Sequence, residues 1–406
     1  MDLLWWRAMP IGYASTLPRT SDLVIVGGGI VGAATAFHAA RAGIRPVVLE
    51  RRPRLATLTT AAAAGGFRMQ VDSEEDLRLI GESVDLFLRF AERTGQREYD
   101  ADVRQSGYLW LTTIEEGAAR QRQLVAAQGD WGLSDVELLD GDAVRRMFPY
   151  VGPEVIQARF RHADGVLDPK ALTMGLFCAS GAEVLTGVEV IGFRAHGGRL
   201  VGVETAAGTV STDAAVIAAG PYSGLVARLA GVELPVTAVV RHKVVMPDVP
   251  AVPKGAPMTI DDDTGAHWRP ALRGAYLLYT DPATPASPPA EDLPIDQGFA
   301  FRLLDPSSPT SVARVSPFWR EVWESGSASW MLQAGQYTMT PDRRPLIGST
   351  PVEGLFANTG YSGRGVMGSP AGSRLLIDVM TGKVPAEANP FRLDRAFASR
   401  PHLDPL

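Results

Sequence analysis

The first regular pattern along the chain is a short apolar run followed by glycines and a helical repeat. Residues 22–26 read Asp-Leu-Val-Ile-Val, and three glycines follow at 27–29. Residues 30–43 have the composition of a helix that ends in glycine, and residues 46–50 (Pro-Val-Val-Leu-Glu) form a second apolar run. Continuous apolar runs of this length are typical of buried strands. The pattern therefore predicts one strand–helix–strand unit of about 30 residues.

Two further helices are indicated by apolar spacing and by end signals. Residues 74–94 place apolar side chains on one face, which predicts a long amphipathic helix. Asp168 and Pro169 are residue types preferred at the N-cap and first position of a helix, which Gly181 would close. Strand-like segments follow at residues 183–193, 200–205, 208–211 and 214–220.

The character of the chain changes between about residue 235 and residue 332. Strand-like segments at 237–246, 257–260 and 275–280 alternate with proline-rich stretches, and residues 281–294 contain five prolines. That composition predicts an extended loop or lid. After residue 330 the chain again resembles its first part, with strand-like residues 331–334 and 354–357 and a helix over 369–381. The pattern predicts one nucleotide-binding domain built from three separated segments, with a mostly β domain inserted between them.

Composition excludes several classes of protein. The 406 residues are 46% hydrophobic and 21% charged, with a net charge of −6, and the mean hydropathy is +0.02. These values indicate a globular chain, and the weak acidity argues against a nucleic-acid partner. The single cysteine, Cys178, excludes an intrachain disulfide and a cysteine-based metal site, and no metal is expected.

The N-terminus carries no clear targeting signal. Asp2 occupies the place where a signal peptide carries positive charge, and the chain has no apolar stretch of 18 residues. We therefore expect a cytoplasmic protein without a membrane-spanning segment. Residues 1–20 are interpreted as a docking tail or loose end, with Trp5 and Trp6 as possible contact residues.

A dinucleotide site is indicated at the first glycine cluster. Gly27-x-Gly29-x-x-Gly32 lies between a strand and a helix, and Glu50 ends the next strand. Gly27 permits a tight turn, Gly29 allows the backbone to approach a pyrophosphate, and Gly32 allows close helix–strand packing. Glu50 would accept hydrogen bonds from a ribose diol. The alternative is a glycine-rich turn beside a surface glutamate.

A second glycine cluster helps to choose between NAD and FAD. Gly363-x-Gly365-x-x-Gly368 matches the same spacing and again joins a strand to a helix, but no acid-ended strand follows it. It is therefore not a second nucleotide domain. A glycine-rich helix start beside the first site could hold the pyrimidine edge of a flavin, where negative charge develops on reduction. The alternative is an ordinary helix N-terminus.

With these motifs, the chain resembles the FAD-dependent D-amino-acid oxidase-like amine oxidoreductases, in particular the branch of sarcosine oxidase, dimethylglycine dehydrogenase and glycine oxidase. The resemblance covers roughly residues 22–385. It rests on Val-Ile-Val-Gly-Gly-Gly-Ile-Val-Gly at 24–32, Thr-Thr-Ala-Ala-Ala-Ala-Gly-Gly-Phe-Arg at 59–68, Asp-Gly at 164–165 with Asp-Pro at 168–169, Ala-Ala-Gly-Pro-Tyr-Ser at 218–223, Tyr-Thr-Met-Thr-Pro-Asp-Arg-Arg-Pro-Leu-Ile-Gly at 337–348 and Tyr-Ser-Gly-Arg-Gly at 361–365.

The resemblance implies an α/β (α+β) fold, in which a Rossmann-type FAD-binding domain is interleaved with a mostly antiparallel β-sheet substrate domain. The FAD-binding domain would comprise residues 21–90, 155–232 and 333–400, and the substrate domain residues 91–154 and 233–332, after the tail of residues 1–20. The cofactor-binding residues implied by the family are Gly27, Gly29, Ile30, Val31, Gly32, Glu50, Arg51, Thr59, Thr60, Gly65, Gly66, Phe67, Val190, Gly220, Gly363, Arg364, Gly365, Val366 and Met367.

Departures from the family pattern shape the expectations for the cofactor and the substrate. Some relatives tether FAD through a cysteine just before Tyr-Thr-Met-Thr, where this chain has Gly335 and Gln336, so noncovalent FAD is expected. Relatives hold the substrate carboxylate with an arginine at the position of Tyr337 or a lysine near that of Met367, and both cations are missing here. Because a buried carboxylate needs a partner, Arg68 is favoured, with Arg241 and Arg269 as alternatives.

The remaining catalytic candidates are Tyr337, His242 and Arg364. Tyr337 would line the substrate cavity, with Trp268 and Tyr279 as further candidates, for which the alternative is a place in the core. His242 and His267 lie near the expected active-site strands, although a structural role is the commoner one for a histidine. Arg364 replaces what is often histidine in relatives and would place a positive charge near the flavin.

The expected activity is oxidation of the C–N bond of an amino acid or N-alkyl amine by hydride transfer to flavin, followed by hydrolysis of the imine. Electrons would pass to oxygen or to a protein acceptor. Two alternatives stay open: oxidation of a hydroxy acid or ring carbon, and a non-catalytic FAD-binding subunit of a hetero-oligomer. The chain could form a homo- or hetero-oligomer in each of these cases.

Overall fold

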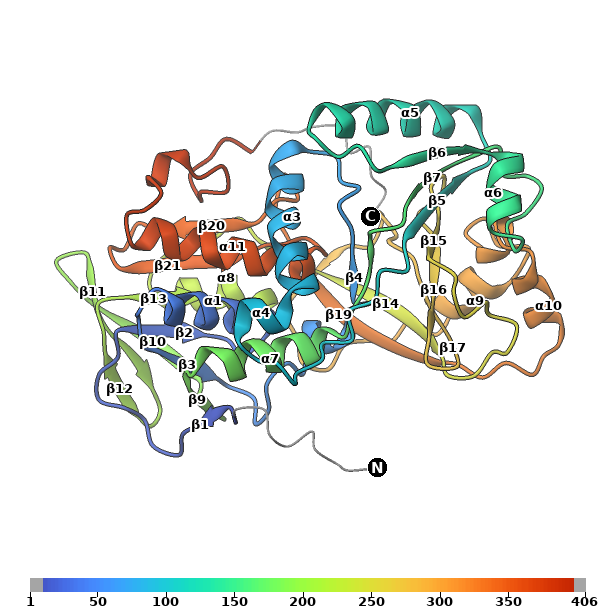
Figure 1. Ribbon diagram of the computed structural model, residues 1–406. Coiled ribbons are helices and arrows are strands. Elements are labelled where there is room, and N and C mark those ends of the chain that lie inside the picture. The colour runs from blue at the N-terminus through green and yellow to red at the C-terminus, as the bar shows by residue number, and fades with distance from the viewer. Residues whose placement is uncertain (1–9, 398–406) are drawn as a thin grey trace.

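In the computed structural model, which describes residues 10–397, a seven-stranded sheet forms the centre of one lobe (Figure 1). All neighbouring strands are parallel except for the last pair. The strand order is β1 (Gly12–Tyr13), β9 (Glu183–Thr186), β3 (Pro46–Glu50), β2 (Leu23–Val26), β13 (Ala215–Ile217), β21 (Leu355–Thr359) and β20 (Leu346–Ser349).

Both faces of this sheet are covered, which explains the unbroken apolar runs in the sequence. Leu23 and Ile25 of β2 pack on one side, in a core shared with helices, whereas Val24 and Val26 pack on the other side. The first side carries α1 (Ile30–Arg41), α3 (Glu74–Leu88), α7 (Pro169–Ser180) and α11 (Gly365–Met380). The second side carries α8 (Ser223–Arg228) and a small antiparallel sheet of β10 (Val190–His196), β11 (Arg199–Thr205) and β12 (Gly208–Ser211).

The second lobe is built on a larger mixed sheet. Its strand pairs are antiparallel except for β15 with β5, which is parallel. The order is β18 (Ala286–Ser287), β14 (Thr237–Met246), β17 (Gly274–Leu278), β16 (His267–Ala271), β15 (Met258–Asp261), β5 (Tyr108–Thr112), β7 (Gln157–Arg161) and β6 (Glu137–Asp140), with β19 (Met331–Met339) paired to β14. The helices of this lobe are α5 (Glu115–Asp130), α6 (Gly141–Met147), α9 (Phe299–Leu304) and α10 (Phe318–Glu324).

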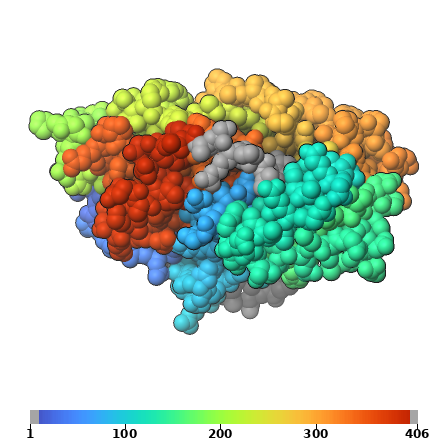
Figure 2. Space-filling view, turned by 90° about the horizontal axis from the view of Figure 1, so that it is seen from above, coloured from blue at the N-terminus to red at the C-terminus, as the bar shows by residue number. Residues whose placement is uncertain are grey.

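Short elements complete the chain between and within the two lobes. Figures 1 and 2 show α3 between the C-terminal segment, in red, and the segment that contains α5, in teal. The remaining elements are α2 (Thr59–Ala62), β4 (Gly66–Phe67), α4 (Phe90–Thr94) and β8 (Gly165–Val166), with 3₁₀ turns at Gly220–Tyr222, Val312–Arg314 and Ala386–Ala388.

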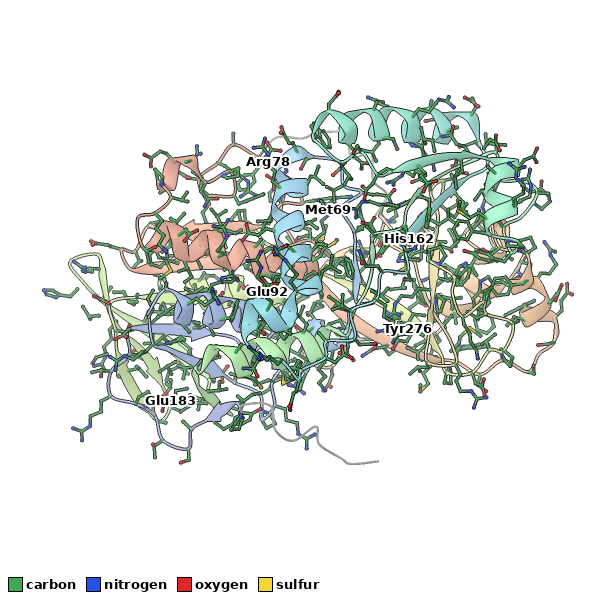
Figure 3. All side chains as sticks on the ribbon, viewed as in Figure 1. Met69, Arg78, Glu92, His162, Glu183 and Tyr276 are labelled. Carbon is green, nitrogen blue, oxygen red and sulfur yellow. The ribbon has the colours of Figure 1, made fainter. Side chains whose placement is uncertain are left out.

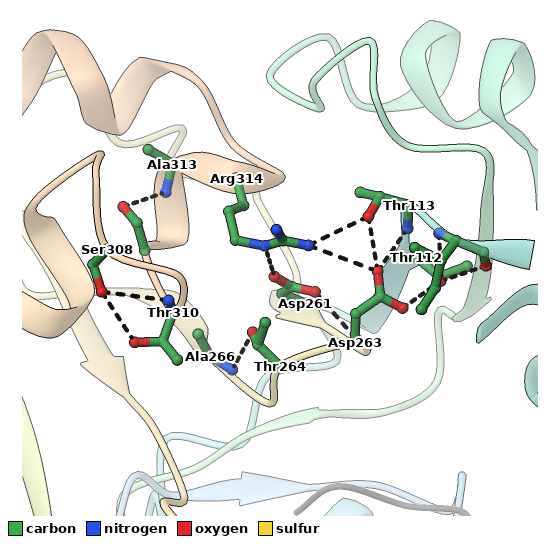
Figure 4. Close-up of polar contacts among 12 residues, drawn as sticks. Thr112, Thr113, Asp261, Asp263, Thr264, Ala266, Ser308, Thr310, Ala313 and Arg314 are labelled. Carbon is green, nitrogen blue, oxygen red and sulfur yellow. Dashed lines mark hydrogen bonds and ion pairs between the residues drawn. The ribbon is translucent and has the colours of Figure 1, made fainter. Parts of the chain in front are cut away.

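A polar cluster connects the sheet of the second lobe to the 3₁₀ turn Val312–Arg314 (Figure 4). Arg314 Nε donates to the buried Asp261 carboxylate at 2.9 Å, and Thr113 donates to Asp263 through its backbone N–H and its hydroxyl. Burial raises the pKa of Asp261, and the Arg314 guanidinium opposes that rise. The cluster holds the parallel pair β5 and β15 together at the point where their segments leave the sheet.

The predicted strand–helix–strand unit is confirmed at β2, α1 and β3. The predicted helix ends after Asp168 are also confirmed, because the Asp168 carboxylate accepts hydrogen bonds from the N–H groups of Lys170 and Ala171, both at 2.8 Å. The prediction of one continuous helix over residues 74–94 is wrong, because the structure has two helices there, α3 and α4. The helix breaks at Arg89 (φ −116°, ψ 35°), and Phe90 then turns into the core.

The paired strands differ from the predicted domain boundaries in three places. β7 and β19 lie in the sheet of the second lobe, although residues 155–232 and 333–400 are predicted for the FAD-binding domain. β1 pairs with β9, so residues 12–13 of the predicted tail extend the first sheet. Trp5 and Trp6 lie outside the described residues. The division into two domains stays a prediction at the level of exact boundaries.

Candidate active site

A cavity of about 610 Å³ lies between the two lobes. Its first wall contains the glycine loop after β2, the end of β3 and residues 56–66. Its second wall contains β14 and β19, and the loop that leads into α11 closes the space between them. This volume is in the range of cofactor and substrate cavities in proteins. The two glycine clusters of the sequence therefore meet at one cavity.

The glycine loop after β2 leaves no room for side chains. Gly27 has φ +121°, and a Cβ atom there would lie 2.5 Å from the carbonyl oxygen of Ala218. A Cβ atom at Gly32 would lie 1.9 Å from the carbonyl oxygen of Gly27, so α1 packs directly on the turn. Thr60 Oγ1 accepts the Ile30 N–H at 3.2 Å, close to the first turn of α1. This arrangement is the backbone cradle that a pyrophosphate requires.

The end of β3 forms the adenosine side of the predicted site. The Glu50 carboxylate accepts the N–H groups of Gly28 at 2.7 Å and of Arg52 at 2.8 Å, which fixes its position at the cavity wall. Arg51 lies 4.0 Å above the ring of Tyr222. Val190 and Gly220, which the family resemblance places near the nucleotide, also line this end of the cavity.

The proline-rich loop crosses to this same end. Glu291 forms ion pairs with Arg51, at 2.7 Å, and with Arg52. The Ala290 N–H donates to Gln336 Oε1 at 3.0 Å, so the loop is also held to β19. Residues 281–294, predicted as a lid, therefore run from the second lobe to the end of β3 in the first.

The segment from α2 to β4 contributes several of the residues expected along the cofactor. Thr59, Thr60, Gly65 and Gly66 line the cavity, and Thr59 Oγ1 donates to the carbonyl oxygen of Gln336 at 2.9 Å. Phe67 does not line it. Its side chain is fully buried and packs against Phe87, with ring centroids 5.8 Å apart, because it points to the opposite side of β4.

The loop before α11 lies across the cavity from the first glycine loop. Gly363, Gly365, Val366 and Met367 line the cavity, and α11 begins there, so its positive end faces the interior. Arg364 also lines the cavity, but its Nη1 donates to Asp76 at 2.6 Å and its Nη2 lies 3.5 Å from Asp72. Acidic groups of the α3 region therefore balance the charge predicted to face the flavin, and this geometry does not favour a catalytic role.

One face of the second sheet forms the opposite wall. Side chains two residues apart on a strand point to the same side, so Arg241 and Lys243 of β14 share this face. The strand register adds Tyr337 from β19 and Leu278 from β17, and all four line the cavity. Burial raises the pKa of Tyr337, although nearby Arg241 opposes the rise. Tyr337 thus lies where the sequence predicts a substrate contact.

Arg241 is incompletely bonded at this wall. Its Nη1 donates to the carbonyl oxygen of Asp281 at 3.0 Å, and its guanidinium carbon lies 5.9 Å from the Tyr337 ring centroid. Its buried Nε has no hydrogen-bond partner among the residues that the structure describes. Burial lowers the pKa of Arg241. An unpartnered donor on a residue that lines the cavity indicates a ligand-binding role for Arg241.

Lys243 was not anticipated from the sequence as a site residue. Its side chain is buried, and its Nζ donates to the carbonyl oxygen of Ala63 at 3.3 Å. It also lies 4.5 Å from the ring centroid of Tyr276, which Figure 3 labels, and Arg269 lies 4.6 Å from the same centroid. Burial, and secondarily Arg269, lowers the pKa of Lys243 to about 8. The sequence contains one signal for this role: Lys243 lies two residues after Arg241 in a predicted strand, and so on the same face of it.

Arg68 lies at the cavity but is strongly anchored. It is buried, its Nη1 donates to the carbonyl oxygen of Gln70, and it lies 5.1 Å from the Trp110 ring centroid. The fully buried Asp164 holds the adjacent backbone by accepting the Met69 N–H at 2.9 Å. Burial raises the pKa of Asp164, while nearby Arg161 opposes the rise. The Arg68 side chain is thereby fixed on the protein at one end.

The other candidates divide between the cavity and the core. His242 lines the cavity, but its Nε2 accepts the Asp296 N–H at 3.1 Å, which indicates a structural contact with the neighbouring loop. Tyr279 and His267 also line the cavity. Trp268 is fully buried in the core of the second lobe, and Arg269 donates to the carbonyl oxygen of Ala64 at 2.9 Å outside the cavity lining.

Two features of the described part of the chain bear on other chemistries. Residues 10–397 contain no group of three or more His, Cys, Asp or Glu side chains arranged to hold a metal ion. The helices of the same residues include none with the length and apolarity needed to span a bilayer. Cys178 is buried in α7, away from the cavity lining.

The backbone cradle, the fixed Glu50 and the glycine-rich start of α11 fit an FAD molecule extended through the cavity. The sequence matches the DAO family, described as FAD dependent oxidoreductase, over residues 22–379. The chain belongs to this family. Its cofactor is FAD, as the two glycine clusters predict, and the resemblance to amine oxidoreductases is confirmed at the family level.

Individual relatives match most of the length of this chain. FAD-dependent oxidoreductase domain-containing protein 1 of Xenopus laevis is 27% identical, over 95% of this chain and 85% of that protein. Mitochondrial sarcosine dehydrogenase of Mus musculus is 26% identical over 92% of this chain. The match covers only 41% of the length of that relative. The crystal structure of L-proline dehydrogenase from P. horikoshii is similar with a TM-score of 0.81 at 25% identity, over 93% of this chain and 99% of that one.

Proposed function

We propose that this FAD-dependent oxidoreductase oxidises the C–N bond of an amino acid or an N-alkyl amino acid. The observation that carries the proposal is Arg241, whose buried Nε has no partner among the described residues and whose side chain lies on the cavity wall beside Tyr337. A guanidinium can bind a carboxylate through two parallel hydrogen bonds. The names of the relatives, which include sarcosine and L-proline dehydrogenases, support an amino-acid substrate.

Arg241 replaces Arg68 as the preferred carboxylate ligand. Arg68 is anchored on Gln70 and Trp110, whereas Arg241 lines the cavity and its buried Nε has no partner among the described residues. Tyr337 lies beside Arg241 on the same wall, and the Tyr337 ring would orient the substrate by contact. The wall thus supplies positioning, on which hydride transfer from a neutral amine mainly depends.

When bound, FAD supplies the two-electron oxidant for the C–N bond, and water then hydrolyses the imine to a carbonyl compound and an amine or ammonia. The proposed electron acceptor is oxygen or a protein. A cytoplasmic location and a homo- or hetero-oligomeric assembly remain part of the proposal. The rate at which air reoxidises the reduced holoenzyme in stopped flow distinguishes an oxidase from a dehydrogenase.

The test is anaerobic bleaching of the flavin spectrum by a panel of D- and L-amino acids, N-methyl amino acids and 2-hydroxy acids. Bleaching by amino acids but not by their hydroxy analogues supports the proposal. In Arg241→Met, kcat/KM for amino acids should fall about a hundredfold, because a charge-assisted pair is lost. The control is Arg273→Met, which removes an exposed arginine of the same lobe. Bleaching only by hydroxy acids, or by nothing in the panel, would overturn the proposal.

A further inference from the structure

The wall of β14 contains more positive charge than one carboxylate requires. Arg241 and Lys243 both line the cavity, and within the described residues neither has a carboxylate within 4.0 Å. The carboxylates in the described lining are Glu50 and Glu189, and both lie near Arg51 at the adenosine end. The part of the cavity beside β14 is therefore cationic, with Asp281, outside the lining, as the nearby acid that acts on Arg241.

Lys243 is held in place without being neutralised. Its Nζ has a single, long hydrogen bond to Ala63 and stands over the Tyr276 ring, which orients the ammonium group but supplies no full negative charge. Burial of a lysine in such a setting disfavours the charged form, and its pKa is lowered accordingly. A bound anion would reverse this cost, because an opposite charge within a few ångströms favours the ammonium form.

The spacing of the two cations suits one small molecule. Residues two apart on a strand are separated by about 6.6 Å, and their side chains leave the sheet on the same side. Arg241 lies towards Tyr337 and Asp281, whereas Lys243 lies towards Tyr276 and Ala63. The two charges therefore face the cavity at separate points along one wall.

We propose that Lys243 binds a second carboxylate of the substrate, so that the enzyme acts on a dicarboxylic amino acid or an N-carboxyalkyl amino acid. This inference rests on the proposed function, because it takes Arg241 as the ligand of the first carboxylate. One carboxylate binds the planar guanidinium of Arg241, and the other binds the ammonium group of Lys243. The amine lies between the two carboxylates.

The test compares acids with their neutral amides on the holoenzyme. Aspartate against asparagine, glutamate against glutamine, and iminodiacetate against its monoamide differ in one charge at nearly constant shape. The wild-type enzyme should prefer each reactive acid by about tenfold or more in the second-order rate of flavin bleaching, as expected for a charge-assisted hydrogen bond. In Lys243→Met the acid-to-amide ratio should fall by about tenfold.

Two controls make the result specific. Lys254→Met removes an exposed lysine of the same lobe and should leave the ratio unchanged. Calorimetry provides a readout without turnover: glutarate should bind the wild type more tightly than butyrate, and this difference should disappear in Lys243→Met or in Lys243→Gln, whichever retains FAD.

The outcomes separate the two proposals. Equal rates with acids and amides, or an acid preference that survives removal of Lys243, would overturn the role of Lys243 while leaving amino-acid oxidation intact. Flavin bleaching by no amino acid, acidic or neutral, would overturn the proposed function and this inference with it.

Discussion

Gly363 packs directly against the ring of Tyr337. A Cβ atom added at Gly363 would lie 2.6 Å from Tyr337 Cε2, and Gly363 also has φ +91°. The loop before α11 and the substrate wall of β19 therefore meet at a point where no side chain fits. This contact fixes the distance between the expected flavin edge and the residue expected to touch substrate.

Gly363→Ala should weaken FAD binding by about tenfold, because the new methyl group forces the loop or Tyr337 to move. The measurement is the dissociation constant of FAD for reconstituted apoprotein. Gly382→Ala is a matched control, since Gly382 has φ +72° but open space around it, and so shares only the backbone strain. Equal losses of affinity in the two variants would show that the contact with Tyr337 has no effect.

Acid precipitation should release FAD into the supernatant. Gly335 occupies the position at which some relatives carry a tethering cysteine, and a Cβ atom there would lie 2.7 Å from Ala62 Cβ. The sole cysteine, Cys178, is buried in α7 outside the cavity lining. The mass of the denatured chain should equal that of the unmodified polypeptide. Yellow colour that remains with the pellet would contradict noncovalent binding.

The kcat/KM for a dicarboxylic amino acid should fall as the pH rises above about 8. Burial lowers the pKa of Lys243 to about 8, so the free enzyme loses the ammonium group in this range and with it the attraction for a carboxylate. In Lys243→Arg the decline should move to higher pH, because a guanidinium stays charged there. A profile of unchanged position in this variant would assign the decline to another group.

Acid should destabilise the protein partly through His38 of α1. Burial, followed by the charges of Arg374 and Arg41, lowers the pKa of His38 from 6.5 to about 3. Between these two values the unfolded chain binds a proton that the folded chain does not, so stability is present above pH 6.5 and is lost as the pH falls towards 3.

Urea unfolding at pH 7.5 and pH 5 tests this linkage. The wild type should lose up to about 2 kcal/mol more than His38→Phe between the two values, since each pH unit below 6.5 contributes about 1.4 kcal/mol. His196→Phe, at an exposed position on β10, should behave as the wild type does. Identical pH dependence in wild type and His38→Phe would exclude His38 as the cause.

The parts of the fold that could be predicted from sequence are those with strong local signals. The unit of β2, α1 and β3 has glycines at its turn and apolar strands, and α7 has an N-cap, a first-position proline and a closing glycine. β14 was predicted with its observed bounds, Thr237–Met246. In each case the local pattern and the tertiary environment favour the same structure.

The region from residue 91 to residue 154 gave no such signals. α5 has a weak apolar pattern, because its buried residues include Gln121 and Gln128. β5 is short and fully buried, and its parallel partner, β15, is far away in sequence. Among the site residues, Lys243 was missed because a charged residue inside a strand pattern normally indicates exposure to water. Phe67 and Arg364 were expected at the flavin, but local backbone direction and the acids near α3 determine where their side chains point.

The order of strands in the first sheet also has a consequence for biosynthesis. β2 lies beside β13, and β13 lies beside β21, so neighbours in the sheet come from the beginning, the middle and the end of the chain. The glycine loop leaves the ribosome early, yet the strands that support it and the loop before α11 follow only near residues 215 and 355. Contacts this distant in sequence form slowly. The nascent chain is therefore expected to remain without its cofactor until the segment that contains β21 and the start of α11 has been synthesised.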